Sequence, residues 1–64
     1  MNMMFFNYKH LPEPLQPVSK AINKVAHEMN DLLPPGREKA AGLRKLLEAK
    51  DCFVRANLPG ANDE

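Results

Sequence analysis

The sequence predicts an all-α protein: an antiparallel two-helix hairpin with an extended or short-helical N-terminal arm, assembling into a homo-oligomeric helical bundle. Two long segments with helical spacing of apolar residues, separated by the breaker Pro34-Pro35-Gly36, predict the hairpin. The length predicts assembly, because 64 residues bury too little surface to offset the conformational entropy lost on folding. Cys52 is the single cysteine, so no disulfide within the chain can compensate, and other copies of the chain are the favoured remedy.

The arm comprises residues 1–16 and is rich in aromatic residues and proline. Proline lacks an amide hydrogen and biases the preceding residue towards extended conformations, so the arm is expected to be extended, and polyproline-like near residues 11–14. Phe5 and Phe6 are expected to fold back and cap the apolar end of the hairpin. The first six residues are apolar but too short for the hydrophobic region of a signal peptide.

The first helix is expected at residues 17–33, with Pro17 at the favourable first position. Its apolar residues are spaced by alternating steps of three and four, which is the rhythm of a helix seam and not of a strand. They are Leu15, Val18, Ile22, Val25, Met29 and Leu32. This seam is expected to pack on the second helix.

The second helix is expected at residues 37–57, followed by a mobile tail at 58–64. It carries two apolar stripes. The first stripe consists of Ala40, Leu43, Leu47 and Val54, and the second of Gly42, Leu46, Ala49, Phe53 and Ala56. One stripe suffices to pack on the first helix, so the second is expected to contact other subunits; the alternative is one wide core face. Lys50 occupies a seam position, from which it reaches water or points into a pocket between subunits.

Composition and charge exclude several classes of function. The net charge of +1 argues against duplex nucleic acid as a partner, and no apolar run is long enough to cross a membrane. The chain lacks zinc-ligand spacing, a phosphate-binding glycine loop and a nucleophile constellation. Cys52 is expected to be a buried thiol. We therefore expect a soluble, cytosolic binding protein that is not an enzyme and carries no metal or cofactor.

The candidate ligand-binding residues are Tyr8, Lys9, His10, Lys20, Arg37 and Lys39. An aromatic ring beside two potential cations can stack on a base and attract a phosphate; alternatively, the ring of Tyr8 packs on the hairpin. Arg37 and Lys39 open a helix whose unpaired amides favour an anion, although a simple interhelix turn explains them equally. Lys20 either faces an anion or belongs to a solvated surface.

A family resemblance rests on a set of short motifs: Phe6-x-Tyr8, His10, Pro12, Pro34-x-x-Arg37-Glu38, Leu46 and Ala49. With these motifs in this order, the chain resembles the helical-hairpin domain of phage anti-CBASS sponges, a domain that anti-Thoeris sponges share. The pattern covers about residues 5–56. It departs from the family at Lys9, which intervenes between Tyr8 and His10, and in the second helix, where Leu47 replaces an acidic residue and 52–54 replace an aromatic-Ala-Asn stretch.

The resemblance implies a homo-oligomer, commonly a hexamer, with ligand pockets between protomers. It further implies a phage anti-defence protein that sequesters cyclic di- or trinucleotide immune signals without cleavage, in the cytoplasm of the infected bacterial host. The family's base-stacking tyrosine corresponds to Tyr8, and Arg37 belongs to its turn motif. The alternative is a small helical oligomeric protein-interaction module of unknown partner.

Overall fold

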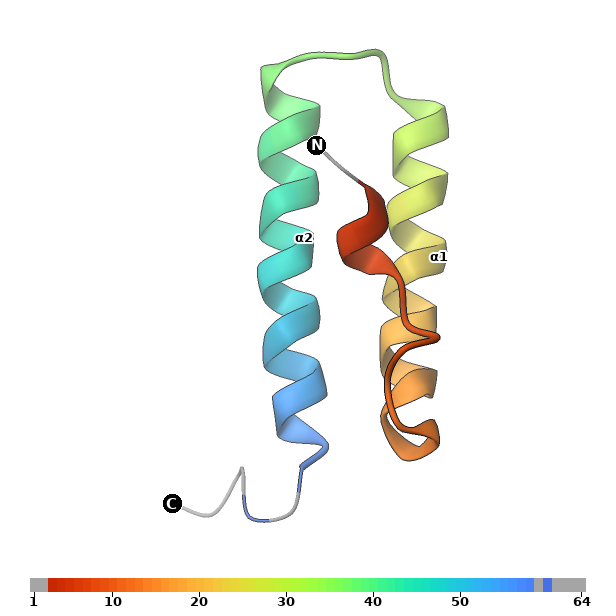
Figure 1. The fold of residues 1–64 in the computed structure, drawn as a ribbon. Coiled ribbons are helices and arrows are strands. Elements are labelled where there is room, and N and C mark those ends of the chain that lie inside the picture. Colours follow the sequence, from red (N-terminus) through yellow and green to blue (C-terminus); the bar gives the residue numbers. More distant parts are fainter. Residues whose placement is uncertain (1–2, 59, 61–64) are drawn as a thin grey trace.

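The computed structural model describes residues 3–58 and 60, and in this part the chain is all-α without a strand. Two antiparallel helices, α1 (Gln16–Leu32) and α2 (Arg37–Ala56), form a hairpin (Figure 1). Two 3₁₀-helices precede them, η1 (Met3–Phe6) and η2 (Glu13–Leu15). The predicted hairpin is confirmed, and its helices begin and end within one residue of the predicted bounds. The predicted mobile tail lies outside the described residues, except for positions 58 and 60.

Helix α1 ends where the prolines require it. Leu33 adopts the extended conformation (φ −109°, ψ 141°) that a following proline favours. The ammonium group of Lys39 then donates hydrogen bonds to the carbonyl oxygens of Asn30, at 2.8 Å, and Leu33, at 3.0 Å. A helix leaves its last carbonyls without partners, and a cation at this end also offsets the negative pole of the helix dipole. Lys39 therefore caps α1 from the first turn of α2.

Helix α2 carries charges that suit its dipole, with Glu38 in the first turn and Arg55 in the last. Beyond its end, the amide Nδ2 of Asn57 donates to the carbonyl of Pro14 at 3.0 Å. This contact joins the C-terminal end of α2 to η2. In the described part of the chain, neither helix combines the length and the apolar character needed to cross a membrane.

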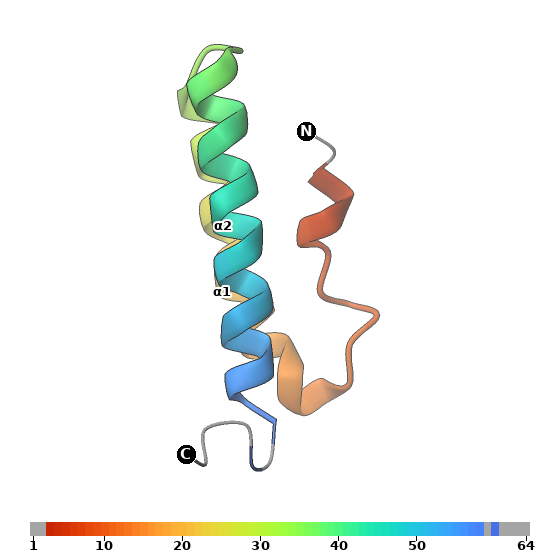
Figure 2. The same cartoon turned by 90° about the vertical axis from the view of Figure 1, so that its left-hand side faces the viewer.

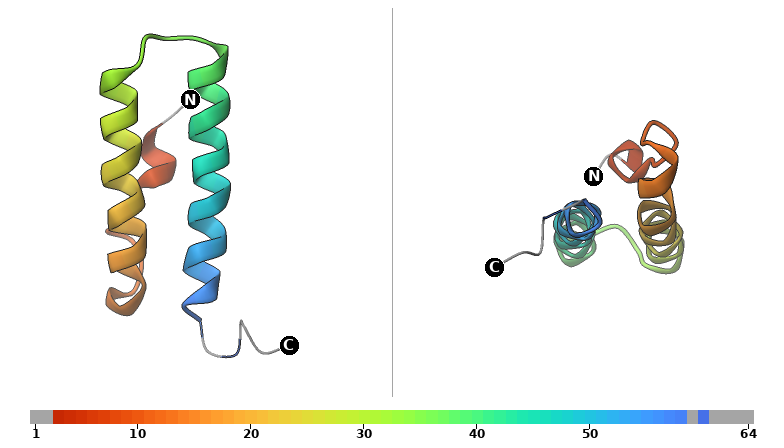
Figure 3. Two further views of the ribbon diagram at one scale, coloured as in Figure 1. Left: turned by 180° about the vertical axis from the view of Figure 1, so that it is seen from behind. Right: turned by 90° about the horizontal axis from the view of Figure 1, so that it is seen from below.

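The arm lies along one side of the helix pair, and no described segment lies on the other side (Figures 2 and 3). Of the two forms predicted for the arm, the structure shows the short-helical one in η1 and η2, while Pro12 keeps the expected polyproline-like conformation (φ −54°, ψ 145°). Phe6 folds back and is fully buried, as expected. It packs in one cluster with Ala26 of α1 and Leu43 of α2 rather than capping the end of the hairpin, whereas Phe5 is 58% exposed.

The core is small and centres on Phe6. The buried hydrophobic side chains are Phe6, Ala26 and Leu43, with Met3, Ile22, Met29, Leu46 and Leu47 packed partly against them. The predicted seam of α1 holds for Ile22 and Met29 but is wrong at Leu32, which is 73% exposed. The helix instead turns the small residues Ser19 and Ala26 inward, because only small side chains leave room for a ring on this face.

Replacing Phe6 by alanine is expected to destabilise the fold by about 3 kcal/mol, since burial of this ring holds the arm to both helices. For a chain of this size the midpoint of thermal unfolding should fall by more than about 10 °C. The matched control is Phe5→Ala, which removes an exposed ring from the neighbouring position and should shift the midpoint by only a few degrees. Circular dichroism melts of both variants measure this, and equal shifts would contradict the assigned core.

Candidate functional site

The fold separates the predicted site residues into different parts of the chain. Tyr8, Lys9 and His10 lie in the loop that descends from η1, while Arg37 and Lys39 lie at the interhelix turn, at the far end of the hairpin (Figure 1). Lys20 is exposed in the first turns of α1. A single chain therefore does not bring all six residues together, and a site that used both groups would need residues from more than one copy.

The loop after η1 is an ordered turn that displays its cations. The amide of Leu11 donates to the carbonyl of Tyr8 at 3.0 Å, which closes a turn with Lys9 and His10 at its corner. The side-chain oxygen of Asn7 accepts from the amide of Lys9 at 3.2 Å. Lys9 and His10 are exposed, and Tyr8 is half-buried. The arrangement leaves two potential cations in solvent beside one ring that is only partly covered.

Side chains from both helices fix this loop at its two ends. Before the loop, Asn23 donates to the carbonyl of Phe6 at 2.9 Å and Lys50 donates to the carbonyl of Phe5 at 2.7 Å. After it, the amide Nε2 of Gln16 donates to the carbonyl of Leu11 at 2.7 Å. We call Asn23 and Lys50 the arm clamp. The ammonium group of Lys50 binds the arm of its own chain rather than extending freely into water, and its side chain is only 12% exposed. A role for Lys50 in a pocket between subunits stays a prediction.

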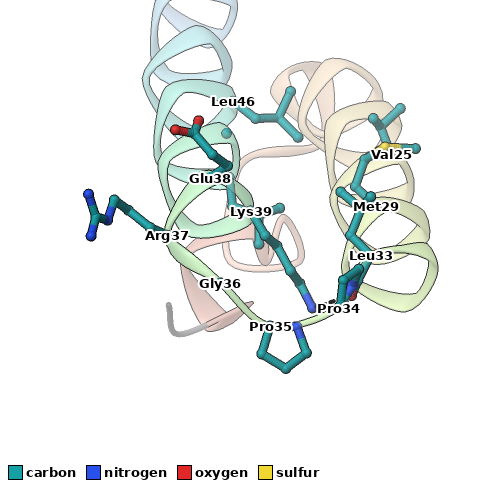
Figure 4. A pocket seen from close by; sticks show the side chains of 12 residues that line it. Val25, Met29, Leu33, Pro34, Pro35, Gly36, Arg37, Glu38, Lys39 and Leu46 are labelled. Atoms are coloured by element: carbon teal, nitrogen blue, oxygen red, sulfur yellow. Dashed lines mark hydrogen bonds between the residues drawn. The ribbon is translucent and has the colours of Figure 1, made fainter.

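A second feature is an open apolar hollow of about 800 Å³ between the helices at their turn end (Figure 4). Val25, Met29, Leu33 and Leu46 provide much of its apolar lining, and Pro34–Lys39 close it at the turn. Its volume falls within the roughly 300–1,000 Å³ typical of small-molecule sites. The structure therefore places Arg37 and Lys39 at the rim of this hollow.

The two cations at this rim have different surroundings. The Lys39 side chain reaches across to the end of α1, where two carbonyls accept from it, while Arg37 points away from α1 (Figure 4). The sequence allowed two interpretations of this segment, an anion site and a simple interhelix turn. The turn explains the position of Lys39, because its ammonium group caps the end of α1. The exposed Arg37 is the rim cation that remains most accessible to an anion.

The hollow coincides with the second apolar stripe of α2. Gly42 and Leu46 of that stripe line it, and Phe53 lies further along at 51% exposure. On α1, Val25 is 41% exposed. No arm residue contributes to the lining, since the arm packs on the other side of the helices. Within the described chain the stripe is divided, because Leu46 packs partly against the Phe6 core and Ala49 is half-buried, whereas Gly42, Phe53 and Ala56 are exposed. Contact of this stripe with other subunits stays a prediction.

Comparison with known proteins finds no relative. The sequence matches no family model, and no curated protein or solved structure is significantly similar to it. Residues 3–58 and 60 contain no group of three histidine, cysteine, aspartate or glutamate side chains placed to hold a metal ion. Cys52 is exposed, so the expectation of a buried thiol was wrong.

Replacing Lys50 by methionine is expected to release the arm while keeping the helices, because methionine retains an apolar stem but cannot donate to the Phe5 carbonyl. Tyr8 is the only tyrosine and the chain has no tryptophan, so tyrosine fluorescence reports on the arm alone. The fluorescence anisotropy of Tyr8 should fall in Lys50→Met at unchanged far-ultraviolet circular dichroism. Lys45→Met, on an exposed position of the same helix, serves as control. Unchanged anisotropy in Lys50→Met would show that the clamp does not hold the loop.

Proposed function

We propose that this protein is a homo-oligomeric sponge that binds cyclic di- or trinucleotide immune signals without cleaving them, as a phage anti-defence protein in the infected bacterial cytoplasm. The observation that carries the proposal is an open apolar hollow on one side of the hairpin, together with an anchored loop of aromatic and cationic residues on the other side. Copies that cover the stripe create clefts between subunits, and such a loop can line a cleft of this kind. The motif resemblance supplies the class of ligand.

Assembly is supported by the balance of buried and exposed apolar side chains. Among the described residues, three hydrophobic side chains are buried. Seven large ones are exposed: Met4, Phe5, Val25, Leu32, Leu33, Phe53 and Leu58. Soluble monomers rarely expose large contiguous apolar patches, and a helix pair with one arm has no further element to cover them. Association with further copies removes this surface from water at about 25 cal/mol per Å². The resemblance implies a hexamer.

Ligand binding is supported by the chemistry of the loop. The ring of Tyr8 can stack on a nucleobase, a contact worth about 1–3 kcal/mol per base. Lys9, His10, Lys20 and Arg37 are exposed and can approach phosphates, and charge-assisted hydrogen bonds are about twice as strong as neutral ones. A sponge acting on micromolar signals needs a Kd near the nanomolar range, about −12 kcal/mol. Two-fold related subunits would present each contact twice, which suits a ligand with two bases and two phosphates.

A protein-interaction module is the second candidate, and one observation favours it. The lining of the hollow is dominated by apolar side chains and proline, and the ammonium group of Lys39 already binds carbonyls of its own chain. Such a surface accepts a helix or an apolar side chain more readily than a phosphate. This candidate predicts assembly without any affinity for cyclic nucleotides.

Isothermal titration calorimetry against a panel of cyclic di- and trinucleotides tests the proposed function. At least one ligand should bind, and chromatography of the mixture should return it unchanged. Tyr8→Ala should weaken binding at least roughly tenfold through loss of stacking, while Tyr8→Phe, which keeps the ring, should stay within a few-fold of the original affinity. Absence of heat with every ligand, or the appearance of a cleavage product, would refute sequestration.

Val25→Glu should disrupt the oligomer, because it places a charge in the lining of the hollow at a position that a single chain leaves partly in solvent. Sedimentation should change from oligomer to a folded monomer or smaller assembly at micromolar concentration. Lys24→Glu, at the neighbouring exposed position, controls for the added carboxylate and should leave the oligomer intact. An original chain that sediments as a well-folded monomer would contradict the proposed assembly.

A further inference from the structure

A small cavity of about 230 Å³ lies between the arm and the C-terminal half of α2. It is lined by His10, Leu11, Lys50, Asp51, Val54 and Arg55. The α2 residues form two pairs four residues apart, 50 with 54 and 51 with 55, so they share one side of the helix. His10 and Leu11 come from the turn that the arm clamp and Gln16 hold in place. The fold thus brings nitrogen-bearing side chains from distant segments to one space.

The lining has a net positive charge. Lys50 and Arg55 contribute two positive charges and Asp51 one negative charge, so these three side chains give the cavity a net charge of +1. The ammonium group of Lys50 lies 3.5 Å from the carboxylate of Asp51, which compensates that carboxylate, and its side chain is only 12% exposed. The position of this cation is fixed by its hydrogen bond to the carbonyl of Phe5.

Arg55 supplies the most available donors. Its Nη2 donates to the sulfur of Cys52 at 3.4 Å, and a thiol sulfur is a weak acceptor that an anion readily replaces. The planar guanidinium group presents its donors in a fork that matches two oxygens of a phosphate. Arg55 lies one turn from Lys50, so both cations can approach the same ligand from α2 while His10 approaches from the arm.

The size of the cavity limits what it can hold. Its volume is several times the roughly 30 Å³ that a water molecule takes in the liquid, but it is below the roughly 300–1,000 Å³ of sites for drug-sized ligands. One carboxylate and one imidazole are too few ligands for a structural metal ion. A small oxyanion fits the volume and the charge better than a cation or an entire dinucleotide.

We infer that this cavity binds a phosphate group, with Arg55 and His10 as its contacts and Lys50 as the fixed cation behind them. The group is either inorganic phosphate or the phosphodiester of a nucleotide; in the second case the inference deepens the proposed function and rests on it. Arg55 was not a candidate in the sequence, and Lys50 was considered only as a seam residue.

Nuclear magnetic resonance of the ¹⁵N-labelled full chain tests the site at constant ionic strength. The chain has three arginines, and the Nε–H signal of Arg44, which belongs to neither proposed site, is the internal control for Arg55. The chain is titrated with inorganic phosphate and, separately, with 3′,5′-cyclic adenosine monophosphate. In at least one of the two titrations, the Nε–H signal of Arg55 and the backbone amide signal of Leu11 should shift saturably. Arg55→Gln should weaken the saturable binding roughly tenfold or more, and Arg44→Gln should leave it unchanged.

Each outcome separates the two proposals. Saturation with phosphate shows a free-anion site, and saturation with the cyclic mononucleotide alone shows that the phosphodiester must be carried by a nucleotide. Equal, linear shifts at all three arginines, or unchanged affinity in Arg55→Gln, overturn the site. If cyclic dinucleotides bind in calorimetry while Arg55 does not respond, this inference fails and the proposed function stands. If Arg55 responds to phosphate but no cyclic nucleotide binds, the site stands and the proposed function fails.

Discussion

The insertion of Phe6 between α1 and α2 is the contact on which the rest of the described structure depends. Two helices packed side by side have one line of contact, and a ring placed on that line contributes an apolar group that neither helix supplies. Its full burial is worth about 1.5–3 kcal/mol. The hydrogen bonds from Asn23 and Lys50 to the neighbouring carbonyls add to this, because they pair backbone groups that the packed arm withdraws from water. The same contact that completes the core therefore also fixes the loop that begins at the next residue.

The arm covers one side of the hairpin only, and this asymmetry links the fold to function. On the covered side, hydrogen bonds and burial hold the arm in place and form a small charged cavity, while Met4 and Phe5 stay exposed. On the other side, the second stripe of α2 and the end of α1 remain apolar and open. A chain of this size has no further element with which to cover them. The two sides thus suit different tasks, the open side for contact with other copies and the arm side for polar ligands.

The sequence predicted the elements better than their contacts. Helix bounds followed from local rules, since the spacing of apolar residues and the Pro-Pro-Gly turn act within a few residues. The inward face of α1 was predicted less well, because Ser19 and Ala26 are too small or too polar to count in an apolar pattern. The bond from Lys50 to the carbonyl of Phe5 joins residues 45 positions apart, and no local pattern predicts it. Candidate site residues were likewise chosen by chemical type. Arg55 was missed because it follows Lys50 by five residues, a spacing that does not make two helix side chains neighbours, and only the arm packed against α2 defines the cavity that both residues line.

The distribution of the candidate residues restricts how a shared site can be built. The loop of Tyr8 and the turn of Arg37 lie far apart along the hairpin, so one ligand can contact both only if they come from different copies. Parallel association keeps like ends together and would form separate sites, one of loops and one of turns. Antiparallel association about a two-fold axis places the turn of one copy beside the open end of another, and it repeats each contact by symmetry. The covered and uncovered sides of the hairpin then decide which faces meet, since the open side offers the apolar hollow and the arm side offers the exposed Met4 and Phe5.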